Sequence, residues 1–324
     1  MSRAETRNGH SGLSTHQPRT GLTHDPRFLA GAAGGLVSAL AALWAFHGLP
    51  LGAILFWLAP LPLCLAGLGF GLPSFLIAVV VAGVALLVDS ISTLPALIYL
   101  GAFGVPAALL LATALRGLAH GGGHLALGLP LALLGLWPAA VLLLTALSLA
   151  SPEGGLEQSL REAVSAGLVH MGVEEPEGLV TQVIRLQAAA MALWLAVVLA
   201  GNAGLAQWLL RRQGLALAPA TRWSTARLPR WYPALPVLAA LAWLLADPAH
   251  ALVPLSLCLV LLVPMVLQGL AVLHTRLRPA KARAPLLVLI YVLLLVFSLP
   301  GAIVLVALGL VDQFGRRNPP PANT

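Results

Sequence analysis

Long uninterrupted apolar runs are the feature of this sequence that most restricts its fold. Residues 125–150 contain no ionisable side chain, and comparable runs follow one another along the chain. About 20 apolar residues suffice for a helix to cross the hydrocarbon of a bilayer. Because 59% of the residues are hydrophobic and only 9% are charged, too little polar sequence remains for a separate soluble domain. We therefore predict an all-α, polytopic transmembrane helix bundle.

The apolar runs predict nine spans. They cover about 28–47, 51–70, 72–88, 93–115, 125–150, 183–210, 231–247, 249–273 and 285–311. Five spans thus fall within 28–150 and four within 183–311, between a polar tail at 1–27, a polar insertion at 151–182 and a C-terminal tail at 312–324. Only a short Gly-rich stretch separates the second and third spans. Residues 51–88 therefore form either two full spans or a re-entrant hairpin covered by protein.

The distribution of Lys and Arg predicts the orientation of the bundle. Basic residues gather in segments 1–27, 116–124, 211–230 and 274–284, which nine spans place on one side. The positive-inside rule makes that side the cytoplasm. Connections 48–50, 89–92 and 248–250 carry no Lys or Arg and are expected outside. Arg316 and Arg317 disagree with this topology. If the last segment does not fully cross, the chain has eight spans and a cytoplasmic C-terminus.

Charge and composition bound the location and the partners. The formal charge of +7 comes from residues scattered in loops beside apolar runs. That placement suits the headgroups of a lipid bilayer better than nucleic acid, which we exclude as a partner. Of the 18 basic residues, 17 are Arg, and with abundant Ala, Leu, Gly and Pro this indicates a GC-rich bacterium. The predicted location is therefore the bacterial inner membrane, with the N-terminus in the cytoplasm.

The start of the chain and the cysteines allow two further expectations. The apolar run after Arg27 is as long as a full span, which favours an uncleaved first helix over a signal peptide. A mitochondrial transit peptide is the competing interpretation. Cys64 and Cys258 both lie inside apolar runs. There they behave as small hydrophobic residues, and two cysteines make no metal framework.

The insertion at 151–182 holds six of the eleven acidic residues and is predicted outside the membrane. Leu156, Leu160, Val164 and Leu168 recur every four residues, which indicates an amphipathic helix. Ser151 and Pro152 are typical of its start, and Glu157 can pair with Arg161 on the polar side. This helix either covers apolar helix ends or forms a lid over a substrate cavity. After Pro176, a long helix over 177–212 is expected.

The spans lack the groups that most membrane enzymes and ion-coupled carriers need. Asp89 and Asp247 fall at segment ends, and no Asp, Glu, Lys or Arg sits at the middle of a span. A proton-driven antiporter and an intramembrane aspartyl protease are therefore disfavoured. No zinc-hydrolase, nucleotide-binding or nucleophile-elbow motif is present. His120 and His124 alone make a poor metal site in a glycine loop. We expect no catalytic activity, no metal and no cofactor.

Two groups of residues are candidates for binding. Asn202, Gln207 and Gln268 are neutral hydrogen-bonding groups inside spans, where they hold helices together or contact a ligand. Five arginines of the 211–230 linker could dock a cytoplasmic partner: Arg211, Arg212, Arg222, Arg227 and Arg230. The paired glycines at 31 and 35 have the spacing that lets helix backbones touch.

Several short stretches resemble the uncharacterised YybS-like bacterial integral membrane proteins. They are Leu58-Ala59-Pro60-Leu61-Pro62-Leu63 with Gly67-Leu68-Gly69, Tyr99-Leu100 with Phe103-Gly104-Val105-Pro106-Ala107, Gln268 to His274, and Gly309-Leu310-Val311-Asp312-Gln313. That family is distantly similar to the substrate-binding membrane subunits of energy-coupling-factor vitamin transporters. The resemblance implies a small-molecule-binding bundle that works with separate ATPase and coupling subunits. The number of spans and the acidic insertion depart from those subunits, and no vitamin-binding residue carries over.

Together these features predict a non-catalytic, substrate-binding transport component for a neutral or amphipathic small molecule. Its expected partners are the lipid bilayer and an energising ATPase complex. The alternative is a structural or assembly factor that organises other membrane or envelope proteins. An enzyme acting on lipid or isoprenoid substrates ranks third, because no cluster of acidic residues is available to hold Mg²⁺ beside a diphosphate.

Overall fold

A computed structural model describes residues 25–89, 92–119, 125–149, 155–170, 172, 177–219 and 226–315. Every regular element in this part of the chain is helical. The elements are α1 (Pro26–Phe46), α2 (Gly52–Leu58), α3 (Pro60–Phe70), α4 (Leu72–Asp89), α5 (Leu94–Tyr99), the π-helical turn η2 (Leu100–Gly104), α6 (Val105–Ala119), α7 (Gly128–Ser148), α8 (Gly155–His170), α9 (Glu177–Arg212), α10 (Ala234–Leu245), the short η4 (Pro248–His250), α11 (Leu252–Arg276), α12 (Arg283–Val296) and α13 (Ser298–Gly315). The predicted all-α fold is confirmed.

Eight helical segments of the described chain are long and apolar enough to span a membrane. They include the predicted second and third spans, now Gly52–Phe70 and Leu72–Asp89, which are separated at Gly71. The φ angle of Gly71 is +94°, a conformation that L side chains rarely adopt, so the chain turns there without strain. Within the former segment, Pro60 divides α2 from α3. Both segments have the length of full spans.

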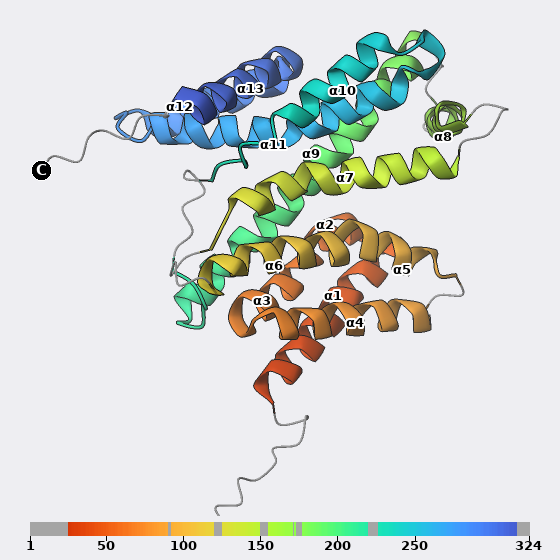
Figure 1. Cartoon of the computed structure of the whole chain (residues 1–324). Coiled ribbons are helices and arrows are strands. Elements are labelled where there is room, and N and C mark those ends of the chain that lie inside the picture. Colours follow the sequence, from red (N-terminus) through yellow and green to blue (C-terminus); the bar gives the residue numbers. More distant parts are fainter. Residues whose placement is uncertain are drawn as a thin grey trace, which may run out of the picture.

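The helices form two groups joined by α7 and α9 (Figure 1). In the lower half of that view, α1 packs on α3 and α4. In the upper half, α11 packs on α10 and α13. The long α9 contacts α3 of the first group and α11 of the second, while α7 contacts both α6 and α11. The length of α9, 36 residues, was expected from the sequence. With a rise of about 1.5 Å per residue, α9 extends well beyond the membrane thickness.

Glycine makes the closest helix contacts in each group. A Cβ atom at Gly31 would lie 2.6 Å from the carbonyl oxygen of Ser74, and one at Gly35 would overlap the carbonyl oxygen of Ala78. The predicted small-residue packing of the first span is therefore confirmed, with α4 as its partner. On the other side of the molecule, Gly269 of α11 and Gly309 of α13 bring those two backbones together in the same way. Close approach of this kind replaces the hydrophobic effect as the packing force in lipid.

Two predicted spans differ in the structure. The predicted span 231–247 contains only the 12-residue α10, about 18 Å long against about 30 Å of hydrocarbon. Prolines explain its limits, because Pro233 precedes its first residue and the extended Ala246 leads to Asp247 and Pro248.

The predicted span 285–311 is divided into α12 and α13 at Phe297. Pro300 lacks a backbone N–H, and its ring would collide with the carbonyl of Val296, which is the last residue of α12. Residues 312–315, predicted as part of a tail, continue α13. Arg316 and Arg317 lie outside the described residues.

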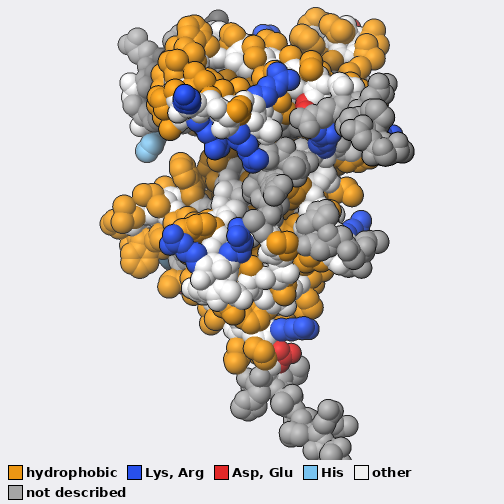
Figure 2. Space-filling view, turned by 90° about the vertical axis from the view of Figure 1, so that its left-hand side faces the viewer, with side chains coloured by type: hydrophobic (Ala, Val, Ile, Leu, Met, Phe, Trp, Pro, Cys, Tyr) orange, Lys and Arg blue, Asp and Glu red, His pale blue; other side chains and the backbone are white. Residues whose placement is uncertain are grey.

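Basic side chains gather at one end of the bundle. The C-terminal ends of α6, α9 and α11 lie on the left of Figure 1, whereas those of α4, α7 and α10 lie on the right. Figure 2 looks onto the left-hand end and shows Lys and Arg side chains over both halves of it. This grouping agrees with the predicted placement of segments 211–230 and 274–284 on one side.

Candidate functional site

A pocket of about 540 Å³ lies between α5, η2, α7, α8, α9 and α11. We call it the large pocket and define it by Gly101, Trp137, Leu156, Gln187, Trp194 and Val260, which are among its lining residues. Small-molecule sites in proteins have volumes of about 300–1,000 Å³, walls that are mainly apolar and a few polar groups. The volume and the lining of the large pocket both meet this description. None of the described residues that line it carries a charge.

A π-helical turn forms part of the wall. In η2 the wider turn replaces the regular α-helical bonding pattern. The carbonyl oxygen of Gly101 in this turn accepts a hydrogen bond of 2.9 Å from the indole N–H of Trp137. That bond joins η2 to α7 across the pocket wall and fixes the Trp137 ring. A Cβ atom added at Gly101 would meet no other atom within 4 Å, so this glycine faces open space.

A second wall is aromatic. The Trp194 ring of α9 lies 6.2 Å from the ring of Phe103 and 6.5 Å from that of Phe56, measured between ring centroids. Phe103 is fully buried behind it. Each such ring pair stabilises the fold by about 0.5–1.5 kcal/mol, in addition to the stabilisation from burying the ring surfaces. The cluster holds Trp194 as a rigid side of the pocket.

The polar groups of the large pocket are neutral. The Oε1 atom of Gln187 is buried and accepts no hydrogen bond from any described residue. Ser256 of α11 is 3% exposed and also lines the pocket. The Thr145 hydroxyl donates to the carbonyl of Val141 within α7, at 2.8 Å. A buried acceptor without a donor has a free-energy cost of about 1–3 kcal/mol, which a ligand that donates a hydrogen bond to Gln187 would relieve.

The predicted amphipathic helix borders this pocket. α8 places Leu156 and Leu160 in the lining, and Leu156 is buried. On its polar side Arg161 and Glu157 form the expected ion pair, with Nη2 3.3 Å from Oε1. The amphipathic character of the helix is therefore confirmed. The predicted start at Ser151 and Pro152 lies outside the described residues.

A smaller polar pocket of about 140 Å³ adjoins the large pocket at Ile184, which lines both. We call it the polar pocket and define it by Glu157, Arg161, Thr181, Arg185 and Trp243. Arg185 makes no ion pair or hydrogen bond with any described residue. An apolar space and a charged one thus lie side by side where α8 meets α9.

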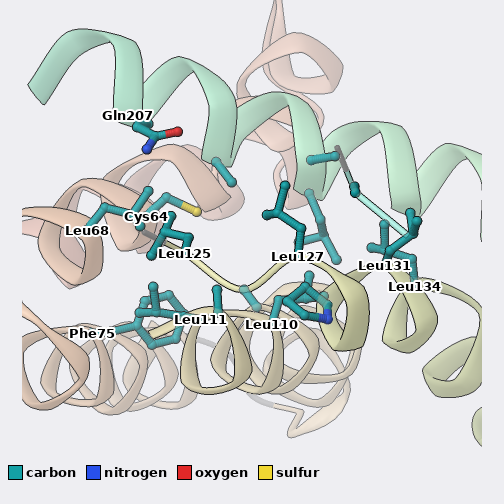
Figure 3. Close-up of a pocket in the computed structure, with 17 residues that line it drawn as sticks. Cys64, Leu68, Phe75, Leu110, Leu111, Leu125, Leu127, Leu131, Leu134 and Gln207 are labelled. Atoms are coloured by element: carbon teal, nitrogen blue, oxygen red, sulfur yellow. The ribbon is translucent and has the colours of Figure 1, made fainter. Parts of the chain in front are cut away.

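A third space, the small cavity, lies further along the same helices. It measures about 90 Å³ and is lined mainly by Leu, Ala and Phe from α3, α4, α6, α7 and α9 (Figure 3). Gln207 lies at one end of it, and Cys64 is a second lining residue. The segment α5–α6 and the helices α7 and α9 each line the large pocket with one part of their length and the small cavity with the next part. The two spaces are therefore stacked along the bundle axis.

The three neutral residues predicted as site groups lie apart. Asn202 is buried, and its side-chain amide donates to the carbonyls of Trp57 and Val198, each at 2.8 Å. Its Oδ1 has no partner among the described residues. Gln207 lines the small cavity and donates to the carbonyl of Pro219 at 3.0 Å. Neither residue lines the large pocket.

Gln268 is the centre of a hydrogen-bond network between α11, α13 and the segment before α10. Its Oε1 accepts from the Leu228 N–H, while its amide donates to the Gly309 carbonyl and to Oε1 of Gln313, each at 3.1 Å. Gln313 in turn donates to the Leu228 carbonyl at 2.8 Å, which closes the ring. Gln268 is 2% exposed. Its side-chain oxygen and both amide hydrogens are engaged in hydrogen bonds within the protein, so we expect Gln268 to hold helices together.

The arginines predicted to dock a partner have different surroundings. The Arg212 guanidinium lies 4.1 Å from the centroid of the Trp208 ring, a cation–π contact. Arg227 pairs with the buried Asp312 of α13 at 3.3 Å and so contributes to the packing of the Gln268 network. Arg211 and Arg230 are exposed, and Arg222 lies outside the described residues. The sequence did not distinguish these environments.

No group of three His, Cys, Asp or Glu side chains within the described ranges could hold a metal ion. His120 and His124 lie outside those ranges. Both cysteines are free thiols, and Cys64 is buried, as expected of a small hydrophobic residue in an apolar run. Asp89, predicted at a helix end, pairs there with His47 at 3.0 Å, and both side chains are largely accessible. The expectation that the protein is not an enzyme stays a prediction.

The chain also matches a known protein family. The family described as "Predicted membrane protein (DUF2232)" matches residues 36–313. The protein belongs to this family. The description of this family names a membrane protein, so the match supports the membrane location and names no substrate. No curated protein and no solved structure matches the chain.

For this family member, the best candidate site contains residues that the sequence analysis did not single out. Gly101, Trp137 and Gln187 lie 36 and 50 residues apart along the chain and meet only in the folded bundle. Gln187, like Asn202, is a neutral polar residue within a long apolar run, and the criterion that selected Asn202 would also have selected Gln187. Trp137 and Gly101 carry no comparable signal, because tryptophan and glycine are common in any membrane helix.

Proposed function

We propose that this protein is a non-catalytic, substrate-binding component of a membrane transport system for a neutral or amphipathic small molecule. The observation that carries the proposal is the large pocket, with its rigid tryptophan walls, its uncharged lining and the unpartnered Oε1 of Gln187. These features suit an apolar ligand with one or two hydrogen-bond donors. The stacking of the large pocket on the small cavity supports transport over storage, because both lie along one axis of the bundle.

The proposal includes an energising partner. The chain resembles YybS-like proteins, and the distant similarity of that family to energy-coupling-factor substrate-binding subunits suggests a separate ATPase complex. The exposed Arg211 and Arg230 lie toward the basic end of the bundle, where such a partner would dock from the cytoplasm. This assignment places the N-terminus in the cytoplasm of a bacterium and the large pocket toward the outer face. A protein that receives a substrate from outside would have its binding site there.

Filling the large pocket tests the proposal. Gly101→Leu projects a side chain into the open space and leaves the carbonyl that binds Trp137 in place. Gly201→Leu is the matched control, since Gly201 is exposed in α9 and a Cβ there meets no atom within 4 Å. Native mass spectrometry of protein purified from membranes in mild detergent would identify a co-purifying small molecule. We expect it on the parent and the Gly201→Leu variant, and its loss from Gly101→Leu.

Equal occupancy of all three proteins would show that the molecule binds elsewhere and would contradict this site. An empty parent protein that instead co-purifies with other envelope proteins would favour the alternative, a structural or assembly factor. Substitution of two exposed residues of α8 that line neither pocket, Glu162 and Val169, separates the two functions further. For an assembly factor that uses this helix, Glu162→Arg with Val169→Glu abolishes the association with those proteins, whereas a substrate-binding component keeps its ligand.

A further inference from the structure

The two pockets beside α8 have complementary chemistry. Consecutive residues of this helix belong to different pockets, with Leu156 and Leu160 lining the large pocket and Glu157 and Arg161 lining the polar pocket. Neighbouring positions on a helix lie about 100° apart, so one helix can present an apolar and a charged surface to adjacent spaces. Ile184 of α9 lines both pockets and marks their boundary. The two pockets are therefore adjacent.

The charges of the polar pocket favour an anion. Among the described residues, its charged lining groups are Arg161, Arg185 and Glu157, so two positive charges face one negative charge. Glu157 is engaged by Arg161 in the ion pair at 3.3 Å. Arg185 has no ion-pair or hydrogen-bond partner among the described residues. A guanidinium binds phosphate and carboxylate groups through paired, charge-assisted hydrogen bonds.

We propose that the large pocket and the polar pocket together bind one amphipathic anion. Its apolar tail lies between Trp137 and Trp194, and its anionic head group, a phosphate or carboxylate, binds Arg185 with Arg161 beside it. The inference rests on the proposed function and narrows its substrate class from neutral or amphipathic molecules to lipid-like anions. The volumes of the two pockets support a ligand with a long apolar tail and a small head group, because the large pocket measures about 540 Å³ and the polar pocket about 140 Å³.

Three probes separate the head group from the tail. The full-length protein in nanodiscs of zwitterionic phosphatidylcholine is titrated with a brominated dodecyl phosphate, with brominated dodecanol and with inorganic phosphate. Bromine on the tail quenches nearby tryptophan, and two of the eight tryptophans line the large pocket. A double variant with Trp137→Phe and Trp194→Phe gives the background from the other rings and from lipid.

We expect the alkyl phosphate to saturate the quenching at a concentration about ten- to a hundredfold lower than the alcohol, as a charge-assisted hydrogen bond predicts. Arg185→Ala should remove that difference, and Arg185→Lys should retain part of it. Arg276→Ala is the matched control, because Arg276 is exposed at the opposite end of the bundle and lines neither pocket. This variant should bind both amphiphiles as the parent does.

Each other outcome overturns the inference. Equal affinity for the alcohol and the phosphate would show that the ligand is neutral, and the proposed function would stand without the anionic class. Displacement of the alkyl phosphate by inorganic phosphate at similar concentration would show a site for the free anion. An absence of pocket-specific quenching by either amphiphile would remove both the inference and the proposed site.

Discussion

The Gln268 network gives the sharpest stability prediction. Replacing Gln268 with Leu keeps the volume of the side chain but removes three hydrogen bonds, those to Leu228, Gly309 and Gln313. Side-chain hydrogen bonds in membrane proteins contribute about 0.6 kcal/mol each on average, so their loss accounts for about 2 kcal/mol. The buried N–H of Leu228 loses its acceptor as well, which adds about 1 kcal/mol or more. We therefore expect a loss of about 3 kcal/mol in the free energy of unfolding.

Equilibrium unfolding by SDS in mixed micelles, followed by circular dichroism, measures this change. Gln213→Leu is the matched control, because Gln213 is exposed just after α9. Its substitution should alter the free energy of unfolding by less than about 0.5 kcal/mol. A double-mutant cycle with Gln313→Leu should show a coupling of about 0.6–1.7 kcal/mol between the two glutamines. A loss below about 0.5 kcal/mol for Gln268→Leu would refute the reasoning, since it would mean that the network does not hold α11, α13 and the Leu228 segment together.

Two further predictions concern packing and docking. Gly35→Leu places a side chain against the backbone of α4 at Ala78 and should destabilise the protein by about 3 kcal/mol or prevent its accumulation. The control Gly201→Leu should do neither. Equal yields and equal SDS unfolding midpoints of the two variants would contradict the contact between α1 and α4. Reversing two exposed charges with Arg211→Glu and Arg230→Glu should release the proposed ATPase partner in crosslinking and co-purification. Glu162→Arg, a charge reversal on the exposed side of α8 at the other end, should leave that partner bound. Retention by the double reversal would exclude docking at this linker.

The extent of the helices could largely be predicted from the sequence. The long α9 and the amphipathic α8 follow directly from hydrophobic patterning and from the ion pair between Glu157 and Arg161. The errors came where proline interrupts an apolar run. Pro300 divides the predicted last span into α12 and α13, although composition alone favours one continuous helix. Hydropathy averages over about 19 residues and does not register a single missing N–H.

The candidate site could be predicted only in part. The sequence identified a lid as one of two functions for α8, and the structure places Leu156 at the edge of the large pocket. It also singled out Gln268, but the partners of that residue, Gln313 and the Leu228 backbone, are 45 and 40 residues away in the chain. The distinction between Arg227, which pairs with Asp312, and the exposed Arg230 likewise required the fold.

By itself, the sequence determined that the chain is a bundle of membrane helices with most of its basic residues at one end. Each apolar side chain favours lipid and each charged side chain favours water, whatever the tertiary structure. The tertiary structure decided which apolar surfaces face lipid and which enclose a pocket. In a bilayer both kinds of surface are apolar, so hydrophobicity does not separate them. Only the packing of α5, α7, α8, α9 and α11 turns Trp137 and Trp194 into walls of the large pocket.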